Sequence, residues 1–116
     1  MAIVLWHNPR CGKSRKALEL LRARGIEPAI REYLKEPPSR AEVETLIRST
    51  GGDLALLVRA DEPEFRKAGL ARDRLSVTTI VKAVVAHPIL LQRPIAVAGK
   101  RAIVGRPPEA VLALVE

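Results

Sequence analysis

The sequence predicts an α/β fold with a central mixed four-stranded sheet. Strand-like apolar runs and amphipathic helical runs alternate in the first third of the chain, and the middle third is helical in pattern. Two short apolar runs and a last helix follow. The 116 residues, of which 47% are hydrophobic, suffice for one domain with one core. The expected order is strand, helix, strand, helical insertion, strand, strand, helix.

The first third of the chain has the pattern of a βαβ unit. Residues 2–6 are an unbroken apolar run typical of a buried central strand, which Pro9 ends. Over residues 14–24 apolar side chains recur at helical spacing, and Gly25 is suited to stop the helix. Residues 28–33 predict a second strand, parallel to the first through a right-handed crossover.

The middle third is predicted to be a helical insertion at about residues 39–87 of a single domain, 1–116. Ser39 with Glu42 three residues later is a capping-box sequence, so a helix is expected to start there. The spacing of apolar residues predicts three further helices, over residues 54–58, 62–68 and 78–86. The last of these is rich in β-branched residues, which favour strands, but its apolar positions recur with helical period.

The last third is expected to form two strands and a helix. Residues 94–98 and 101–104 are short apolar runs with only two residues between them, which favours an antiparallel hairpin. Pro107 and Pro108 then lead into a final helix, because the fixed φ of proline suits a first helical turn.

The composition excludes several classes of protein. Twenty Lys and Arg against thirteen Asp and Glu give a net charge of +7, which attracts phosphate-like anions, nucleic acids or acidic partners. The basic residues are scattered and only three residues are aromatic, so no nucleic-acid binding is expected. No apolar run approaches the roughly 20 residues of a membrane span, and no signal-peptide pattern is present. We therefore expect a cytoplasmic protein that does not contact membranes.

The single cysteine, Cys11, falls where the first strand gives way to the first helix. The N–H groups and dipole of a helix N-terminus stabilise an anion, so a cysteine there tends to ionise to the nucleophilic thiolate. The same concavity can hold an oxyanion. With no second cysteine, a redox cycle through Cys11 must take its resolving thiol from another molecule. One cysteine and two histidines offer no zinc ligand set, so no metal is expected. No bound cofactor is expected either.

Three motifs carry a resemblance to a known family. They are His-Asn-Pro-Arg-Cys-Gly-Lys-Ser-Arg at residues 7–15, His-Pro-Ile-Leu at 87–90 leading to Arg-Pro-Ile at 93–95, and Gly-Arg-Pro-Pro-Glu at 105–109. Together they resemble the glutaredoxin-coupled arsenate reductase (ArsC) family over essentially the whole chain, and its short YfgD-like members in particular. The resemblance implies a thioredoxin-like fold.

The resemblance also implies roles for individual residues. It makes Cys11 the catalytic nucleophile and gives substrate binding to three arginines, Arg59, Arg93 and Arg106. The N–H groups of the loop that ends at Gly12 would hold the remaining oxygens of the substrate. Supporting roles fall to His7, Asn8, Ser14, Arg15 and Pro94, the last of these in a cis peptide bond. Each arginine also has the simpler interpretation of a surface charge, and His7 that of a backbone hydrogen-bonding partner.

The activity that the resemblance implies is the reduction of arsenate to arsenite. Cys11 attacks arsenate, glutathione attacks the arsenic adduct, and glutaredoxin resolves it. Arsenate is an anion that repels a thiolate, and the planar fork of arginine is suited to neutralise it. Two alternatives stay open. One is an Spx-like thioredoxin-fold regulator that binds RNA polymerase, although Ser14 stands where such proteins carry a second cysteine. The other is a glutathione-linked thiol oxidoreductase with a different substrate.

Overall fold

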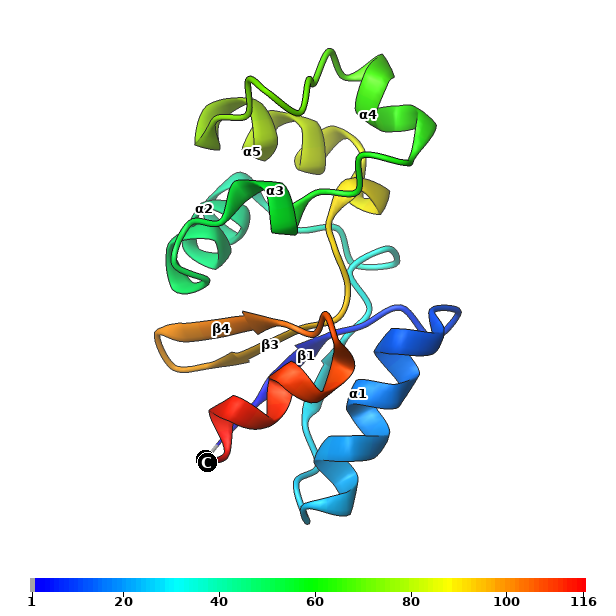
Figure 1. Ribbon diagram of the computed structural model, residues 1–116, viewed down its shortest axis with the longest axis vertical. Coiled ribbons are helices and arrows are strands. Elements are labelled where there is room, and N and C mark those ends of the chain that lie inside the picture. The colour runs from blue at the N-terminus through cyan, green and yellow to red at the C-terminus, as the bar shows by residue number, and fades with distance from the viewer. Residues whose placement is uncertain (1) are drawn as a thin grey trace. The chain divides into compact units, whose positions relative to one another are not determined.

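A computed structural model describes residues 2–116, and their contacts form two compact units (Figure 1). The α/β unit comprises residues 2–36 and 93–116, and the helical unit comprises residues 37–92. That the chain behaves as a single domain stays a prediction. None of the helices in the described part of the chain has the length and apolar character needed to span a bilayer.

The α/β unit is built on a mixed sheet with the strand order β2-β1-β3-β4. The central strand β1 (Val4–Trp6) pairs in parallel with β2 (Ala29–Arg31) and antiparallel with β3 (Ile95–Ala98). β3 in turn pairs antiparallel with β4 (Arg101–Val104). The predicted α/β class, the mixed four-stranded sheet and the C-terminal hairpin are confirmed.

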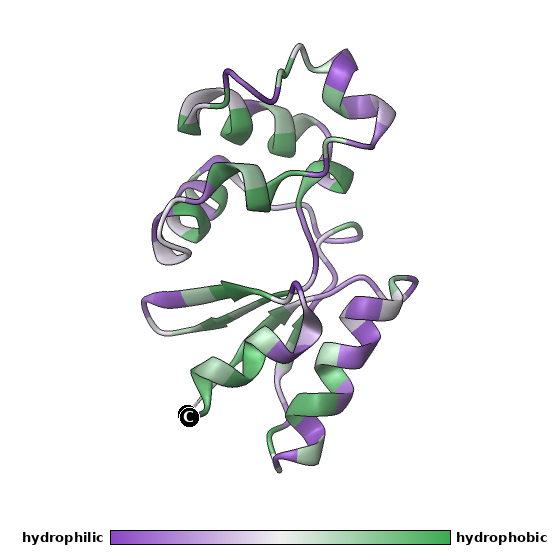
Figure 2. Cartoon of the chain, viewed as in Figure 1, coloured by the Kyte–Doolittle hydropathy of each residue, from purple (hydrophilic) through white to green (hydrophobic). Residues whose placement is uncertain are grey.

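Two helices cover this sheet. α1 (Gly12–Ala23) and the C-terminal helix η2 (Pro108–Leu114) pack against one another, and η2 also contacts β3 and β4 (Figure 1). Their buried side chains form one cluster with those of the strands: Ile3, Leu5, Ala17, Leu21, Ala96, Val111 and Leu114. Figure 2 shows mostly hydrophobic residues along β3 and β4 apart from the start of β4, while α1 alternates between hydrophobic and hydrophilic residues. Each large aliphatic side chain buried in this way stabilises the fold by about 1.5–3 kcal/mol.

The last helix differs in type from the α-helix that the sequence predicts. η2 is a 3₁₀ helix, in which the N–H of Ala110 donates to the carbonyl of Pro107 over 2.9 Å. The helix is short and starts at two prolines, which have no N–H to donate. Val111 and Leu114, three residues apart, are both buried. The threefold repeat of a 3₁₀ helix places such residues on the same face.

The helical unit contains every helix predicted for the middle of the chain. Its elements are α2 (Arg40–Ser49), α3 (Leu54–Leu57), α4 (Pro63–Lys67), α5 (Val77–Ala86) and the 3₁₀ turn η1 (Pro88–Leu90). The capping box at the start of α2 is confirmed, because the Ser39 hydroxyl accepts from the N–H of Glu42 at 3.1 Å and the Glu42 carboxylate accepts from the N–H of Ser39 at 2.9 Å. α5 packs against α2 despite its β-branched residues. Only the turn η1 was not anticipated.

Candidate active site around Cys11

Cys11 is the residue immediately before the first turn of α1. Its backbone is extended, with φ −93° and ψ 121°, so its side chain lies beside the first N–H groups of the helix. The first N–H groups of any helix lack a carbonyl partner within the helix. The N–H of Cys11 donates to the carbonyl of Asn8 at 3.0 Å, and its own carbonyl accepts from the N–H of Arg15 at 3.0 Å. A half-buried free thiol therefore stands at a fixed strand-to-helix turn.

The pKa of the Cys11 thiol lies below its ordinary value. Burial raises this pKa, but the backbone N–H groups of Ser14 and Lys13 at the start of α1 lower it by favouring the thiolate. The guanidinium of Arg93 lowers it further, both as a hydrogen-bond donor and as a positive charge. Since the lowering effects prevail over burial, more of the thiol is ionised near neutral pH than in an ordinary cysteine.

Two of the three predicted arginines lie at the sulfur. Besides Arg93, Arg106 donates from Nη2 toward Sγ of Cys11 at 3.8 Å, although the two residues are 95 positions apart in the sequence. Nε of Arg106 donates to the carbonyl of Arg93 at 3.0 Å. The backbone of one arginine thus orients the guanidinium of the other, and two cations converge on one nucleophile.

The segments that carry these arginines are in close contact. The Arg93–Pro94 peptide bond is cis, as the resemblance implied, and Arg106–Pro107 is cis as well. The N–H of Gly105 donates to the carbonyl of Pro94 at 2.8 Å. A Cβ on Gly105 would lie 2.6 Å from Cγ of Pro94, closer than real Cβ contacts allow. Only glycine fits at this position without a shift of its neighbours.

A buried hydrogen-bond network supports the loop before Cys11. Nδ1 of His7 lies 2.6 Å from Oγ of Ser14, which also accepts from the N–H of Asn8 at 3.1 Å. Oδ1 of Asn8 accepts from the N–H of Arg10 at 3.0 Å. The pKa of His7 is lowered chiefly by burial, with Glu32 raising it and Arg15 and Arg22 lowering it. A neutral His7 can accept the single Ser14 proton at Nδ1. His7 therefore acts on the loop through Ser14.

Arg15 and Gly12 complete the turn. Nη1 of Arg15 donates to the carbonyl of Pro9 at 2.9 Å, so the first turn of α1 is tied back to the loop. A Cβ on Gly12 would meet only Nη2 of Arg15, at an ordinary 3.8 Å. A small side chain at Gly12 would thus meet no close contact.

The third predicted arginine, Arg59, lies in the helical unit and is held there by two side chains. Its Nε donates to Glu62 at 3.1 Å and its Nη1 to Gln92 at 3.0 Å. The Glu62 partner is local, because a turn in which the N–H of Glu62 donates to the carbonyl of Arg59 at 3.2 Å brings the two residues together. Gln92 carries no sequence signal, since it lies 33 positions away. The anion-binding role of Arg59 stays a prediction.

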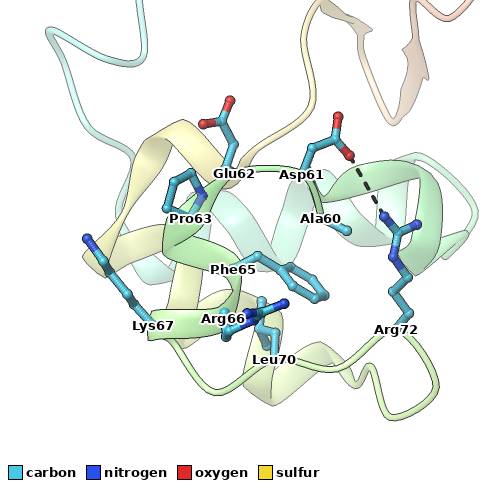
Figure 3. Close-up of a pocket in the computed structure, with 9 residues that line it drawn as sticks. All are labelled: Ala60, Asp61, Glu62, Pro63, Phe65, Arg66, Lys67, Leu70 and Arg72. Atoms are coloured by element: carbon cyan, nitrogen blue, oxygen red, sulfur yellow. Dashed lines mark ion pairs between the residues drawn. The ribbon is translucent and has the colours of Figure 1, made fainter.

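The helical unit also contains a pocket of about 700 Å³. Figure 3 shows Phe65 inside it, with Glu62 and Pro63 on one side and Asp61, paired with Arg72 at 3.8 Å, on the other. Glu62 is thus shared between this pocket and the Arg59 pair. Throughout residues 2–116, no three His, Cys, Asp or Glu side chains gather in an arrangement that could hold a metal ion.

Comparison with known proteins covers nearly the whole chain. The sequence model of the ArsC family matches residues 6–114. The chain is 41% identical to an arsenate reductase of Rhizobium meliloti (strain 1021), over 97% of this chain and 80% of that protein. It is 40% identical to the protein YfgD of Escherichia coli (strain K12), over 97% and 96% of the two chains. A solved structure of an arsenate reductase from Vibrio cholerae superposes with a TM-score of 0.90 at 38% identity and covers 97% of each chain. The matched region includes Cys11 and all three arginines.

Proposed function

The chain belongs to the ArsC family, and from this premise we propose that it reduces arsenate to arsenite, with Cys11 as the nucleophile and external thiols as the reductant. The observation that carries the proposal is the position of the Cys11 thiol, which lies at a helix start next to Arg93 and Arg106 and has a lowered pKa. The nucleophile and two candidate anion-binding side chains thereby lie together in the α/β unit.

Substrate binding falls to the two arginines at the sulfur, and the family resemblance implies a third arginine, Arg59 of the helical unit. A guanidinium stays charged at any working pH and donates two parallel hydrogen bonds to an oxyanion. In the loop up to Gly12, the N–H groups of Asn8, Arg10 and Cys11 already donate within the turn. The further donor on this side is therefore the N–H of Gly12, at the start of α1. These positive groups offset the repulsion between arsenate and the thiolate and stabilise the charge that grows on the oxygens as sulfur approaches arsenic.

The proposed reaction uses the Cys11 thiolate and two thiols from other molecules. The Cys11 thiolate forms a bond to As(V) and one arsenate oxygen leaves as water, with no change of oxidation state. The thiol of glutathione then replaces a second oxygen, which also leaves as water. A glutaredoxin thiolate attacks the glutathione sulfur, forming an S–S bond, and the electron pair of the S–As bond passes to arsenic, which becomes As(III). Water cleaves the remaining bond to Cys11 and arsenite leaves.

External thiols are needed because the chain has one cysteine and cannot close an internal disulfide. The sum of the cycle is arsenate plus two thiols giving arsenite, one disulfide and water, so no bound cofactor is required. Glutathione and glutaredoxin are the partners that we propose, and a reducing compartment such as the cytoplasm, where thiols persist, is the proposed location.

The test is an assay of arsenite formation from arsenate with glutathione and glutaredoxin. The wild-type protein is expected to form arsenite, and Cys11→Ser is expected to form none while its circular dichroism stays unchanged. Lys100→Ala, at the exposed β3–β4 turn, is the matched control and is expected to keep full activity.

Substantial arsenite formation by Cys11→Ser would show that Cys11 is not the nucleophile. If the wild type forms no arsenite with any thiol donor, arsenate is not its substrate. Retention of RNA polymerase on the immobilised protein would then favour the Spx-like alternative. Turnover of a different substrate with glutathione would favour the general thiol oxidoreductase.

A further inference from the structure

A second cavity of the α/β unit adjoins the nucleophile loop. It has a volume of about 240 Å³ and is lined by residues 7–10 of the loop and by Glu32, Leu34 and Lys35 after β2. Its last loop residue, Arg10, is bonded directly to Cys11. We call it the Arg10 cavity. His7 and Asn8 also hold the loop before Cys11, whereas the side chains of Arg10, Glu32, Leu34 and Lys35 have no part in the proposed attack on arsenate.

Both walls of the Arg10 cavity are held by hydrogen bonds that backbone N–H groups donate. After β2, the N–H groups of Lys35 and Glu36 both donate to the carbonyl of Glu32, each at 2.9 Å. On the loop side, Oδ1 of Asn8 accepts from the N–H of Arg10. The side chains that line the cavity therefore project from fixed backbone turns.

A buried polar group opens into the Arg10 cavity. His7 lines the cavity and is only 6% exposed. Its Nδ1 is engaged with Ser14. Within residues 2–116, no hydrogen bond involves its other nitrogen, Nε2, and that atom is not sealed from solvent. When Nδ1 accepts from Ser14, the ring proton resides on Nε2, which can donate to an acceptor in the cavity.

The charges around the Arg10 cavity are of both signs. Arg10 and Lys35 are cations, and Glu32 is a carboxylate that lies 3.5 Å from the ammonium of Lys35. Lys35 is exposed and Glu32 is half-buried, so the pair contributes little and can be exchanged for bonds to a ligand. Leu34 is 40% exposed and offers apolar contact. The cations can bind a carboxylate and Glu32 can bind an ammonium, so the cavity complements a group that bears both charges.

We propose that the Arg10 cavity binds the amino-acid end of the small peptide thiol that attacks the Cys11 adduct, that is, the γ-glutamyl end of a glutathione-like molecule. Glu32 accepts from its ammonium, and Arg10, Lys35 and Nε2 of His7 donate to its carboxylate. The volume is below the roughly 300–1,000 Å³ of pockets that enclose a whole drug-sized ligand, so it holds one end of the peptide. The thiol end then extends toward Cys11. This inference rests on the proposed function.

The first experiment measures binding without turnover. S-methylglutathione cannot react, so its titration into the ¹⁵N-labelled wild-type protein reports the subsite alone. Amide shifts are expected at Arg10, Glu32 and Lys35. Because charge-assisted hydrogen bonds are the strong ones, Lys35→Ala is expected to raise the Kd about tenfold. Lys100→Ala, which removes a cation outside the cavity, is expected to leave the Kd unchanged.

The ammonium is tested with a modified ligand. N-acetyl-S-methylglutathione lacks this charge and is expected to bind the wild-type protein more weakly than S-methylglutathione. Glu32→Gln is expected to bind the two ligands equally. Shifts confined to other parts of the protein, or equal Kd values in Lys35→Ala and Lys100→Ala, would overturn the subsite.

Kinetics separate this inference from the proposed function. Lys35→Ala is expected to raise the KM for glutathione about tenfold and to leave the rate with the uncharged thiol 2-mercaptoethanol unchanged. If arsenite forms and the KM for glutathione does not change, the subsite fails and the function stands. If S-methylglutathione binds as expected and no arsenite forms with any thiol, the function fails and the subsite stands.

Discussion

At the residue scale, the reactivity of Cys11 is decided by opposing effects on one thiol. Burial raises its pKa, and the N–H groups of α1 and the guanidinium of Arg93 lower it. The helix start is a local feature, so the sequence could place Cys11 there. The arginines come from segments about 80 to 95 residues away, and only the resemblance to the ArsC family could bring them to the site.

The first prediction concerns the pH dependence of Cys11. The rate of alkylation by iodoacetamide is expected to level off at a lower pH than that of an ordinary cysteine, because the thiolate is the reactive form. Arg93→Leu removes a donor and a charge, so its profile is expected to shift to higher pH. A profile still rising steeply above the ordinary thiol pKa of about 8.5 in the wild type would contradict a lowered pKa.

The lowered pKa also has a consequence for folding. Because the folded pKa lies below the unfolded one, the thiolate favours the folded state at pH values above the ordinary thiol pKa. This contribution is lost as the pH falls through the lower folded pKa. The free energy of unfolding of the wild type relative to Cys11→Ser is therefore expected to increase with pH across this window in urea titrations. A difference that is independent of pH would count against the linkage.

The second prediction concerns charge geometry at Arg93. Arg93→Lys keeps the positive charge but loses the planar fork, so kcat/KM for arsenate is expected to fall about 100-fold, the usual cost of losing one preorganised donor. Arsenite formation in steady state measures this effect, with Lys100→Ala as the control. Equal activity of Arg93→Lys and the wild type would show that a point charge suffices.

The third prediction concerns the network behind the loop. Ser14 is fully buried and accepts from the N–H of Asn8 while contacting His7. Ser14→Ala leaves buried polar groups unsatisfied, so urea unfolding is expected to show a loss of about 1–3 kcal/mol. Ser49→Ala, at the end of α2, is the control and is expected to change stability by much less. If Ser14→Ala and Ser49→Ala lose equal amounts of unfolding free energy, the hydrogen bonds of Ser14 do not stabilise the fold.

At the element scale, helix-capping residues and the spacing of apolar residues were enough to predict most of the helices and strands. α5 is a helix although its β-branched residues favour strands, because Ser76 and Thr79 form a capping box and the apolar residues recur with helical period. The type of the last helix could not be predicted, since it depends on Val111 and Leu114 sharing one buried face. The contact of Gly105 with Pro94 also carries no sequence signal, because it exists only once β3 and β4 are paired.

The fourth prediction concerns that contact. Gly105→Ala would press a methyl group against Pro94, and overpacking of this kind costs about 1–3 kcal/mol. Arg93, which precedes Pro94, lowers the pKa of Cys11, so a shift of this segment is expected to move the alkylation profile to higher pH as well. Thermal unfolding and alkylation rates measure the two effects. If Gly105→Ala is less stable but its alkylation rate has the same pH dependence as that of the wild type, the contact of Gly105 with Pro94 does not affect Cys11, and this part of the prediction is wrong.

At the scale of the whole molecule, the net charge of +7 acts over long distances. Because attraction of anions to a positive protein is screened by salt, kcat/KM for arsenate is expected to fall as ionic strength rises, most steeply while the Debye length exceeds about 10 Å. Assays at constant pH with sodium chloride measure this effect. A neutral thiol reagent that alkylates Cys11 is the control, since its rate should depend little on salt.

The central claim is that a thiolate and an oxyanion site lie together in the α/β unit, and arsenate protection of Cys11 tests it most directly. The rate of alkylation is measured at fixed pH and ionic strength as arsenate is added. We expect the rate to fall in a saturable way for the wild-type protein and to be insensitive to arsenate in Arg93→Leu. An alkylation rate of the wild type that does not respond to arsenate at any concentration would contradict the account.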